Sequence, residues 1–246
     1  MILEAAGLAK SFGDVEAVGG VSFGVAAGEV VAMIGPNGAG KTTCFNMVNG
    51  QLPADSGSVR LNGREIGRLK AREIARLGVG RTFQITQTFA SMTVRENVQV
   101  ALLSHRGRLA DAWSRAGGLF REEADRLLER VAMLAHAERA CAVLAYGDLK
   151  RVELAMALAG EPQLLLMDEP TAGMASAERL ELMALAASIA RERSIAVLFT
   201  EHDMDVVFAH ADRILVLHRG RLIAEGKPDE VRANADVRDV YLGQDA

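Results

Sequence analysis

A glycine-rich turn after a short apolar run is the feature that most constrains this chain. The apolar run is Val30–Ile34, and the turn reads Gly35-Pro36-Asn37-Gly38-Ala39-Gly40-Lys41-Thr42-Thr43. Its residues match the pattern G-x-x-x-x-G-K-[ST] of a phosphate-binding loop, which joins a buried strand to a helix. A plain glycine-rich turn is the alternative, but it does not explain why the turn lies between an apolar strand and a helix. The turn therefore predicts an α/β protein that binds phosphate groups.

The residue types in this turn suit the chemistry of a nucleotide. Glycines let successive backbone N–H groups turn toward phosphate oxygens, and the N-terminus of the following helix adds positive potential. Lys41 can reach the terminal phosphates, and Thr42 would place its hydroxyl on Mg²⁺. The sequence thus predicts ATP and Mg²⁺ as ligands of one site.

Two adjacent carboxylates, Asp168 and Glu169, end a second apolar run at residues 164–167. Successive side chains on a strand point in opposite directions, so the two carboxylates are expected to differ in role. Asp168 would hold magnesium through its water shell, and Glu169 could polarise an attacking water. Alone, such a pair is more often a solvated strand end. Beside a phosphate loop, it is the expected second half of the site.

His202 follows a third apolar run, at residues 195–199. We expect it at the same sheet end as the phosphate loop, where an imidazole N–H could contact the γ-phosphate. A surface or packing role is the alternative. The other histidines have no such setting and are expected to be structural or exposed: His105, His136, His210 and His218.

The spacing of apolar runs predicts two sheets. The three runs named above each precede a polar turn and a helical pattern, which favours a parallel sheet with crossover helices. Elsewhere, strands joined by glycine-rich turns indicate an antiparallel sheet at residues 2–8, 15–25 and 59–61. Near the end, Arg219-Gly220 predicts a hairpin between residues 213–217 and 222–225, because glycine supplies the positive φ of a tight turn.

Residues 93–160 have a helical pattern instead. It opens at Thr93, with Glu96 at the spacing of a capping box. Helices are predicted at residues 91–105, 121–136 and 149–159.

Composition excludes several classes of protein. Half of the residues are hydrophobic (50%), and the net charge is -4, which gives no basic field for a nucleic-acid backbone. The two cysteines, Cys44 and Cys141, have no metal-ligand spacing and are expected to be buried and reduced. No stretch reaches the roughly 18 apolar residues of a membrane span. A membrane role would therefore come through a partner.

Taken together, these segments resemble the ATP-binding subunits of ABC transporters over nearly the whole chain. Arg81-Thr82-Phe83-Gln84 is similar to the Q-loop of that family. The resemblance implies that Gln84 meets magnesium and the nucleophilic water and couples to the membrane subunit. Phe12 stands where the family has an aromatic residue that stacks on adenine, usually a tyrosine. Phenylalanine keeps the π face and loses the hydroxyl.

Leu144-Ala145-Tyr146-Gly147-Asp148 resembles the family signature, which is commonly Leu-Ser-Gly-Gly-Gln. The resemblance implies that Tyr146, Gly147 and Asp148 bind the γ-phosphate held by an opposite subunit. Backbone N–H groups and the helix dipole could still do so here, but Ala145 removes a hydroxyl donor. The D-loop position, Ala172-Gly173-Met174-Ala175, also lacks the usual aspartate or asparagine. We expect slower hydrolysis at sites that use this signature.

The resemblance implies a P-loop NTPase, RecA-like fold with a mostly parallel core, an antiparallel β subdomain and an α-helical subdomain. Residues 1–246 are expected to form one ABC ATPase domain. Its core and β subdomain would comprise residues 1–90 and 160–246, and the helical signature subdomain residues 91–159.

Three segments resemble ATPases of branched-chain amino-acid importers, a subfamily that also moves other small solutes: residues 146–148, 201–208 and 240–243. The implied partners are a second ABC ATPase subunit, identical or paralogous, transmembrane permease subunits and, indirectly, a solute-binding protein. The implied location is the cytoplasmic face of the inner membrane, and no nucleic-acid partner is expected. The ATPase does not touch the solute, so its residues do not identify it.

Three alternatives remain at this point. The first is a non-transport ABC ATPase of DNA repair or translation, a class that tends to carry coiled-coil insertions or paired ATPase domains. The second is an exporter ATPase for lipid-like cargo. The third is a P-loop kinase, which the signature and the paired carboxylates disfavour.

Overall fold

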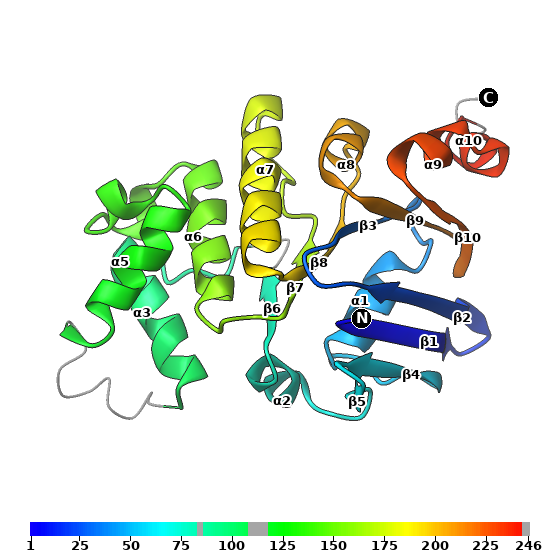
Figure 1. Ribbon diagram of the computed structural model, residues 1–246, viewed down its shortest axis with the longest axis horizontal. Coiled ribbons are helices and arrows are strands. Elements are labelled where there is room, and N and C mark those ends of the chain that lie inside the picture. The colour runs from blue at the N-terminus through cyan, green and yellow to red at the C-terminus, as the bar shows by residue number, and fades with distance from the viewer. Residues whose placement is uncertain (83–85, 108–117, 243–246) are drawn as a thin grey trace.

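A six-stranded sheet with the order β10-β9-β3-β8-β7-β6 crosses the middle of the protein (Figure 1). The computed structural model describes residues 1–82, 86–107 and 118–242, without the side chains of residues 241–242. The strands are β3 (Val30–Ile34), β6 (Val79–Thr82), β7 (Leu164–Asp168), β8 (Ala196–Thr200), β9 (Arg213–His218) and β10 (Arg221–Gly226). All neighbours in this sheet are parallel except β9 and β10. The predicted parallel core and the predicted hairpin are confirmed.

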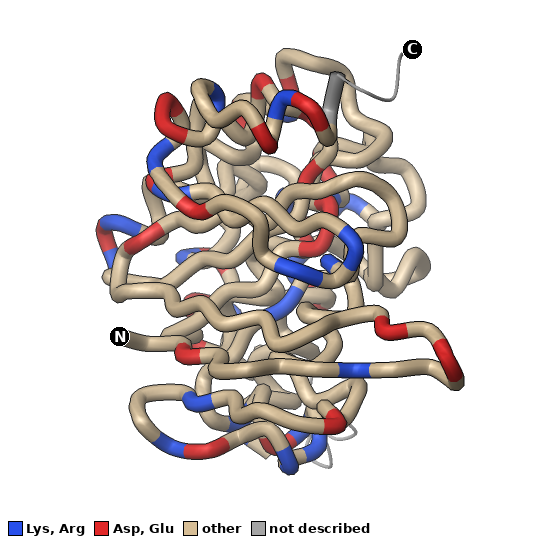
Figure 2. Tube along the Cα trace, turned by 90° about the vertical axis from the view of Figure 1, so that its right-hand side faces the viewer, with Lys and Arg blue, Asp and Glu red and all other residues tan. Residues whose placement is uncertain are grey.

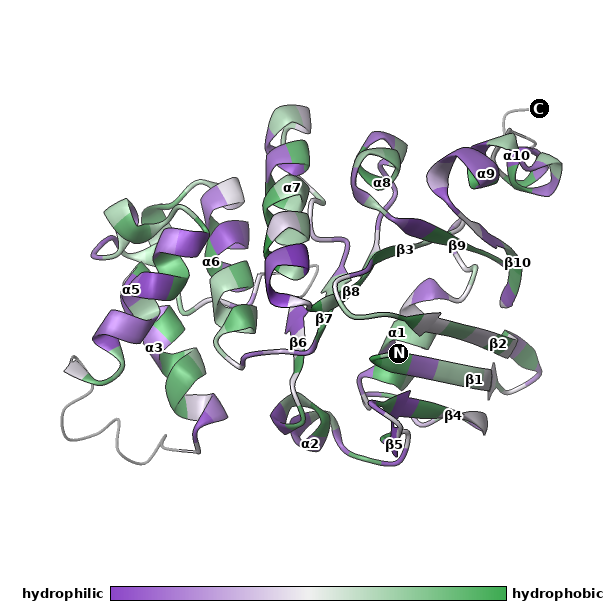
Figure 3. Ribbon diagram, in the orientation of Figure 1, coloured by the Kyte–Doolittle hydropathy of each residue, from purple (hydrophilic) through white to green (hydrophobic). Residues whose placement is uncertain are grey.

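The central strand β3 separates two hydrophobic cores. Its alternate side chains Val30, Ala32 and Ile34 lie in one core, and Val31 and Met33 lie in the other. The first core is closed by α7 (Ser176–Arg193), α8 (Met204–His210) and the helical part of the chain, and the second by α1 (Lys41–Val48) and a second sheet. Figure 3 shows the matching hydrophobic colour along the strands. Burial of both faces explains why these strands read as continuous apolar runs.

The second sheet is antiparallel and has the order β2-β1-β4-β5. Its strands are β1 (Leu3–Phe12), β2 (Val15–Val25), β4 (Ser56–Leu61) and β5 (Arg64–Glu65). Leu3, Leu8 and Val21 face α1 across the second core and are buried. The antiparallel sheet predicted for this half of the chain is confirmed, and β1 continues beyond the predicted range to Phe12.

The helical part contains α3 (Val94–His105), α5 (Arg121–Arg130) and α6 (Tyr146–Leu158), with short 3-10 turns at Leu134–His136 and Cys141–Val143. The capping box at the start of α3 is confirmed. The Thr93 N–H donates to Glu96 Oε2 at 2.8 Å, and the Glu96 N–H donates to Thr93 Oγ1 at 3.2 Å.

The prediction of one helix over residues 121–136 is wrong beyond Arg130. Ala132 adopts a φ of 57°, and the Met133 N–H donates to Leu128 O at 2.7 Å, which is the bond that closes a helix C-terminus. Apolar residues continue at helical spacing after this turn, so the pattern alone conceals the break. The chain turns here without the glycine that usually marks such a site.

The remaining helices are α2 (Ala71–Arg76), α9 (Pro228–Ala233) and α10 (Ala235–Leu242). Within the described residues, no helix has the length and apolar character needed to span a bilayer. Acidic and basic residues are interspersed along the trace (Figure 2). Cys44 and Cys141 are buried, as predicted, and burial raises the pKa of the Cys44 thiol to about 12.

Candidate functional site

The predicted site begins at the carboxyl ends of β3, β7 and β8. Met33 near the end of β3 and Asp168 at the end of β7 both pair with Thr200, the last residue of β8. The loops that follow these strands therefore leave the sheet at the same edge, where open α/β sheets bind ligands. The structure brings the glycine-rich loop, the acidic pair and His202 to this edge.

The glycine-rich loop has a backbone shape that requires glycine at two points. Gly35 and Gly40 have φ values of 153° and 101°. A Cβ on Gly35 would lie 2.2 Å from Leu217 O, and one on Gly40 would lie 2.6 Å from Ala17 O. Strands β9 and β2 thus press against the loop from outside and fix its curvature.

The loop is also tied to the hairpin between β9 and β10. The Gly220 N–H donates to Ala39 O at 3.0 Å, and the Ala39 N–H donates to Pro36 O at 3.1 Å. Asn37 and Gly38 at the tip are exposed. The hairpin glycine, which the sequence assigned only to a turn, therefore supports the phosphate loop.

Lys41 opens α1 and turns its ammonium group back over the loop. Its Nζ donates to Gly35 O at 2.6 Å and to Pro36 O at 3.2 Å, and the residue is only 7% exposed. Burial lowers the pKa of Lys41, and the negative charges of Glu169 and Asp168 oppose this shift. The ammonium group therefore lies in the field of both carboxylates, which joins the two halves of the predicted site.

The N-terminus of α1 is open for a ligand. Its N-cap is Gly40, and in this described part of the chain no side chain caps the helix. The first N–H groups of a helix have no partner within the helix. Thr42 is exposed and Thr43 half-buried in this first turn, so backbone donors and hydroxyls are presented together.

Asp168 is held by two partners. Thr200 Oγ1 donates to Asp168 Oδ1 at 2.9 Å, and Arg81 Nη2 donates to Asp168 Oδ2 at 3.2 Å. The Asp168 and Arg81 side chains are 13% and 14% exposed. The sequence offered no signal for either partner, because both contacts join neighbouring strands that are far apart along the chain.

Glu169 points elsewhere and faces His202. Its backbone φ is 46°, and its N–H donates to Thr200 O and Thr200 Oγ1, both at 3.1 Å. Glu169 Oε1 lies 3.0 Å from His202 Nε2, and the His202 side chain is 48% exposed. The carboxylate and imidazole form one hydrogen-bonded pair at the open side of the site.

A second buried contact stabilises the same loops. Glu201 Oε1 accepts hydrogen bonds from the Thr171 N–H at 2.9 Å and from Thr171 Oγ1 at 2.6 Å. Both residues are at most 4% exposed. This contact ties the segment after β7 to the segment after β8, and sequence reasoning did not find it.

Phe12 lies at the tip of the β1–β2 hairpin. The residue is 53% exposed, and Lys10 Nζ lies 5.8 Å from the ring centroid. The hairpin reaches the phosphate loop through Ala17, which contacts Gly40. Phe12 is thus an exposed aromatic residue on a hairpin that also approaches the phosphate loop.

The signature residues lie apart from the phosphate loop of the same chain. Tyr146, Gly147 and Asp148 form the first turn of α6, which Figure 1 shows on the far side of α7 from α1. The turn packs instead against the D-loop position, where a Cβ on Gly173 would lie 3.4 Å from the Tyr146 ring. Gln84 lies outside the described residues.

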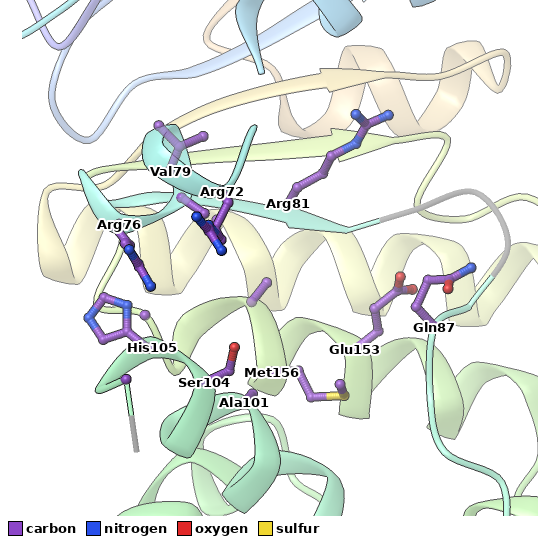
Figure 4. A pocket seen from close by; sticks show the side chains of 15 residues that line it. Arg72, Arg76, Val79, Arg81, Gln87, Ala101, Ser104, His105, Glu153 and Met156 are labelled. Atoms are coloured by element: carbon purple, nitrogen blue, oxygen red, sulfur yellow. The ribbon is translucent and has the colours of Figure 1, made fainter. Parts of the chain in front are cut away.

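A groove of about 490 Å³ separates the core from the helical part (Figure 4). Its walls come from α2, β6, α3 and α6. Lining side chains include Arg72, Arg76, Arg81, His105, Glu153 and Met156. The groove therefore combines arginines on one wall with Glu153 and apolar side chains on the other.

These features define a P-loop nucleotide-binding protein. The chain matches the family model described as ABC transporter over residues 18–172, and residues 221–246 match the model described as branched-chain amino acid ATP-binding cassette transporter. The chain belongs to the ABC transporter family, as one of its ATP-binding subunits.

Individual proteins agree with this assignment. The chain is 42% identical to the high-affinity branched-chain amino acid transport ATP-binding protein BraF of Pseudomonas aeruginosa, with 99% of this chain and 98% of BraF covered. It is 40% identical to the LivG protein of Salmonella typhimurium, with the same coverage.

Solved structures show the same fold. The ADP conformation of the ATP-binding cassette MJ1267 matches with a TM-score of 0.87, 31% identity and 98% of both chains covered. The cassette MJ0796, solved as a dimer bound to ADP and Pi, matches with a TM-score of 0.77 and 25% identity, covering 92% of this chain and 99% of that one. The ABC ATPase fold predicted from the sequence is confirmed.

Proposed function

We propose that this protein is the ATP-hydrolysing subunit of an importer for branched-chain amino acids or a related small solute. The observation that carries the ATPase assignment is the position of Lys41, within the phosphate loop and in the field of Asp168 and Glu169. The solute assignment is supported by full-length similarity to BraF and LivG and by the C-terminal match at residues 221–246.

In this proposal, the loop from Gly35 to Thr43 binds the phosphates of ATP. Backbone N–H groups at the start of α1 would face the phosphate oxygens, and Lys41 would exchange its carbonyl partners for the terminal phosphates. Phe12 would stack on the adenine ring through its exposed face.

The donor set fits Mg²⁺ bound together with a nucleotide. Among the described residues, no group of three or more His, Cys, Asp or Glu side chains could hold a metal by itself. Magnesium is commonly held by one or two protein oxygens plus substrate phosphates, and Thr42 and Asp168 offer such oxygens. Gln84 is a further candidate from the sequence. When bound, the ion would neutralise charge on the phosphates.

Glu169 and His202 would act on the γ-phosphate end of the substrate. Glu169 would accept a hydrogen bond from the attacking water and orient it, while His202 and Lys41 stabilise negative charge on the transferred group. The geometry supports this division, because Glu169 faces His202 whereas Asp168 is held by Thr200 and Arg81.

A complete site would need a second subunit. The signature, in the helical subdomain that we place at residues 91–159, lies far from the loop of its own chain. The signature of a partner would cover the nucleotide on this loop, and ATP binding would close the pair. The partner could be a second copy of this chain or a paralogue. The related cassette MJ0796 is dimeric in its ADP- and Pi-bound state.

The groove between the core and the helical part would receive a permease subunit. It is lined by Arg81 of β6, which also contacts Asp168, so a segment in the groove would lie close to the nucleotide site. Through this contact, the protein would sit at the cytoplasmic face of the inner membrane, with a solute-binding protein on the other side.

The test is transport by the assembled complex. Co-purified permease subunits, this protein and the solute-binding protein are placed in vesicles, and ATP-dependent movement of leucine is measured with the Glu169→Gln variant as the inactive control. We expect leucine uptake toward the ATPase side. Movement of lipid in the opposite direction, without solute uptake, would instead support the exporter alternative.

A further inference from the structure

Arg81 extends from the groove to the phosphate site. It is one of the residues that line the groove, and Figure 4 shows its side chain pointing away from the other labelled residues. Its guanidinium group contacts Asp168 Oδ2 at 3.2 Å. It is the last residue but one of β6, next to β7 in the sheet. A single side chain thus connects two regions that the proposed function uses separately.

The same guanidinium group contacts the phosphate-loop helix. Arg81 Nη1 donates to Gln51 Oε1 at 2.8 Å and lies 3.3 Å from Asn46 Oδ1. Asn46 and Thr42 are four residues apart on α1, so they lie on one face of that helix. Arg81 therefore places its charge between Asp168 and the helix face that carries Thr42. Asp168 and Thr42 are two of the protein ligands expected for magnesium.

The ion pair is poorly screened by solvent. The Arg81 and Asp168 side chains are 14% and 13% exposed. Burial lowers the pKa of Arg81 and the charge of Asp168 opposes this, but a guanidinium group stays protonated in a protein. Asp168 consequently has a cationic partner in the metal-free protein. A divalent cation at Asp168 would be repelled by that partner.

We propose that Arg81 is a positioning residue that serves as the internal counter-cation of Asp168 and competes with Mg²⁺ for it. This rests on the proposed magnesium–nucleotide site. The contact between Arg81 and Asp168 favours the metal-free state, and by linkage it opposes magnesium binding by the same factor. Binding of Mg²⁺ weakens the contact between Arg81 and Asp168 and frees the guanidinium group. Because Arg81 belongs to β6 and lines the groove, its release alters the groove wall.

The test compares nucleotide affinity with and without magnesium. The full-length protein is titrated calorimetrically with a non-hydrolysable ATP analogue, once with Mg²⁺ and once with EDTA, and the ratio of the two affinities is the readout. We expect Arg81→Gln to increase the ratio about 3-fold to 5-fold, the upper end of the usual range for an exposed ion pair, because this pair is mostly buried. Arg81→Lys, which keeps the charge but loses the planar fork, should increase it less, by about 2-fold.

The matched control is Arg72→Gln. Arg72 lines the same groove, and its ratio should equal that of the wild type. Circular dichroism melting in EDTA checks that each variant folds, and Arg81→Lys carries the test if Arg81→Gln does not. An unchanged or lower ratio in folded Arg81 variants would overturn the inference. Failure of the wild type to bind the analogue would instead overturn the proposed nucleotide site.

Discussion

Glu169 is held in the left-handed backbone region, with a φ of 46°. For a residue with a side chain this costs roughly 1 to 2 kcal/mol, so the surrounding structure must impose it. Two hydrogen bonds from the Glu169 N–H to Thr200 do so. The result is that Glu169 turns toward His202 while its neighbour Asp168 faces Arg81.

Replacing Glu169 by glutamine tests the role assigned to this carboxylate. Glutamine keeps the shape and can still hydrogen-bond to His202, but it cannot accept a proton from water. We expect the ATPase rate of the assembled complex to fall about 100-fold or more, the scale of general-base catalysis, and ATP to hold the subunits together. Turnover and gel filtration with ATP measure the two effects.

Glu161→Gln is the matched control for that variant. Glu161 also has a φ of 46° but is exposed and lies after α6. It should leave the ATPase rate unchanged. Rapid turnover by Glu169→Gln would contradict the assignment of Glu169.

The cysteine next to the phosphate-loop threonines should be unreactive. Burial raises the pKa of Cys44 to about 12 and also raises that of Cys141. At pH 8 only about one Cys44 thiol in ten thousand would be a thiolate, the form that reacts. We predict that maleimide labels neither cysteine in the folded protein and both in urea, as counted by mass spectrometry. Labelling of folded Cys44 would show that α1 opens.

At the scale of elements, Arg179 on α7 connects the D-loop position to the start of α8. Its Nε donates to Met174 O at 2.7 Å, and its Nη1 donates to Asp203 Oδ2 at 2.6 Å. Asp203 caps α8 by accepting from the Asp205 and Val206 N–H groups. This bridge and the Thr171–Glu201 contact join the segments after β7 and β8 by hydrogen bonds.

We predict that Arg179→Ala lowers the free energy of unfolding by an amount that depends on pH. The hydrogen bond from Arg179 is the largest cause that holds the pKa of Asp203 below its usual 3.8. A depressed carboxyl pKa contributes stability above the unfolded-state pKa, and that stability is lost as the pH falls through the folded value. The variant should lose about 0.5 to 1 kcal/mol of unfolding free energy at pH 7, and the loss should shrink below pH 3.8.

Urea unfolding at several pH values measures this difference. Arg126→Ala is the control, because Arg126 is exposed in the middle of α5. Its effect should be small and constant with pH. A cost for Arg179→Ala that stays the same down to pH 3 would show that the bridge to Asp203 contributes nothing.

Local patterns predicted most elements, and tertiary contacts explain what they missed. The apolar strands and the capping box at Thr93 depend on neighbouring residues, so the sequence was sufficient. The break at Ala132 has no glycine to mark it, and the partners of Asp168 depend on contacts between segments that are distant along the chain. For the same reason, the loop, the acidic pair and His202 could be found by pattern, whereas Arg81, Thr200 and the Thr171–Glu201 contact could not.

At the scale of the whole molecule, the signature lies apart from the phosphate loop of its own chain, and in the proposed function it would contact the nucleotide of another subunit. The N-cap of its helix α6 is Ala145, which provides no side-chain hydrogen bond. Serine at this position would accept a bond from the first turn and could donate to a phosphate. The substitution Ala145→Ser can therefore affect the stability of the isolated protein and the ATPase rate of the complex, and the two effects can be measured separately.

We predict two results for Ala145→Ser. The isolated protein should melt about 2 to 4 °C higher, because an N-cap is worth roughly 1 kcal/mol. The assembled complex should hydrolyse ATP about tenfold faster or more, because a hydrogen bond to a charged group contributes about 1.5 to 3 kcal/mol. A higher melting temperature with an unchanged rate would show that the serine only caps the helix.

The central claim is that nucleotide phosphates lie between the glycine-rich loop and the acidic strand end. Calorimetric titration of the purified protein with ATP and Mg²⁺ tests it most directly. We predict binding by the wild type, at least about tenfold weaker binding by Lys41→Ala, and no change for Lys227→Ala, which removes an exposed lysine. Equal affinities for the wild type and Lys41→Ala, or no binding by the wild type, would contradict the claim.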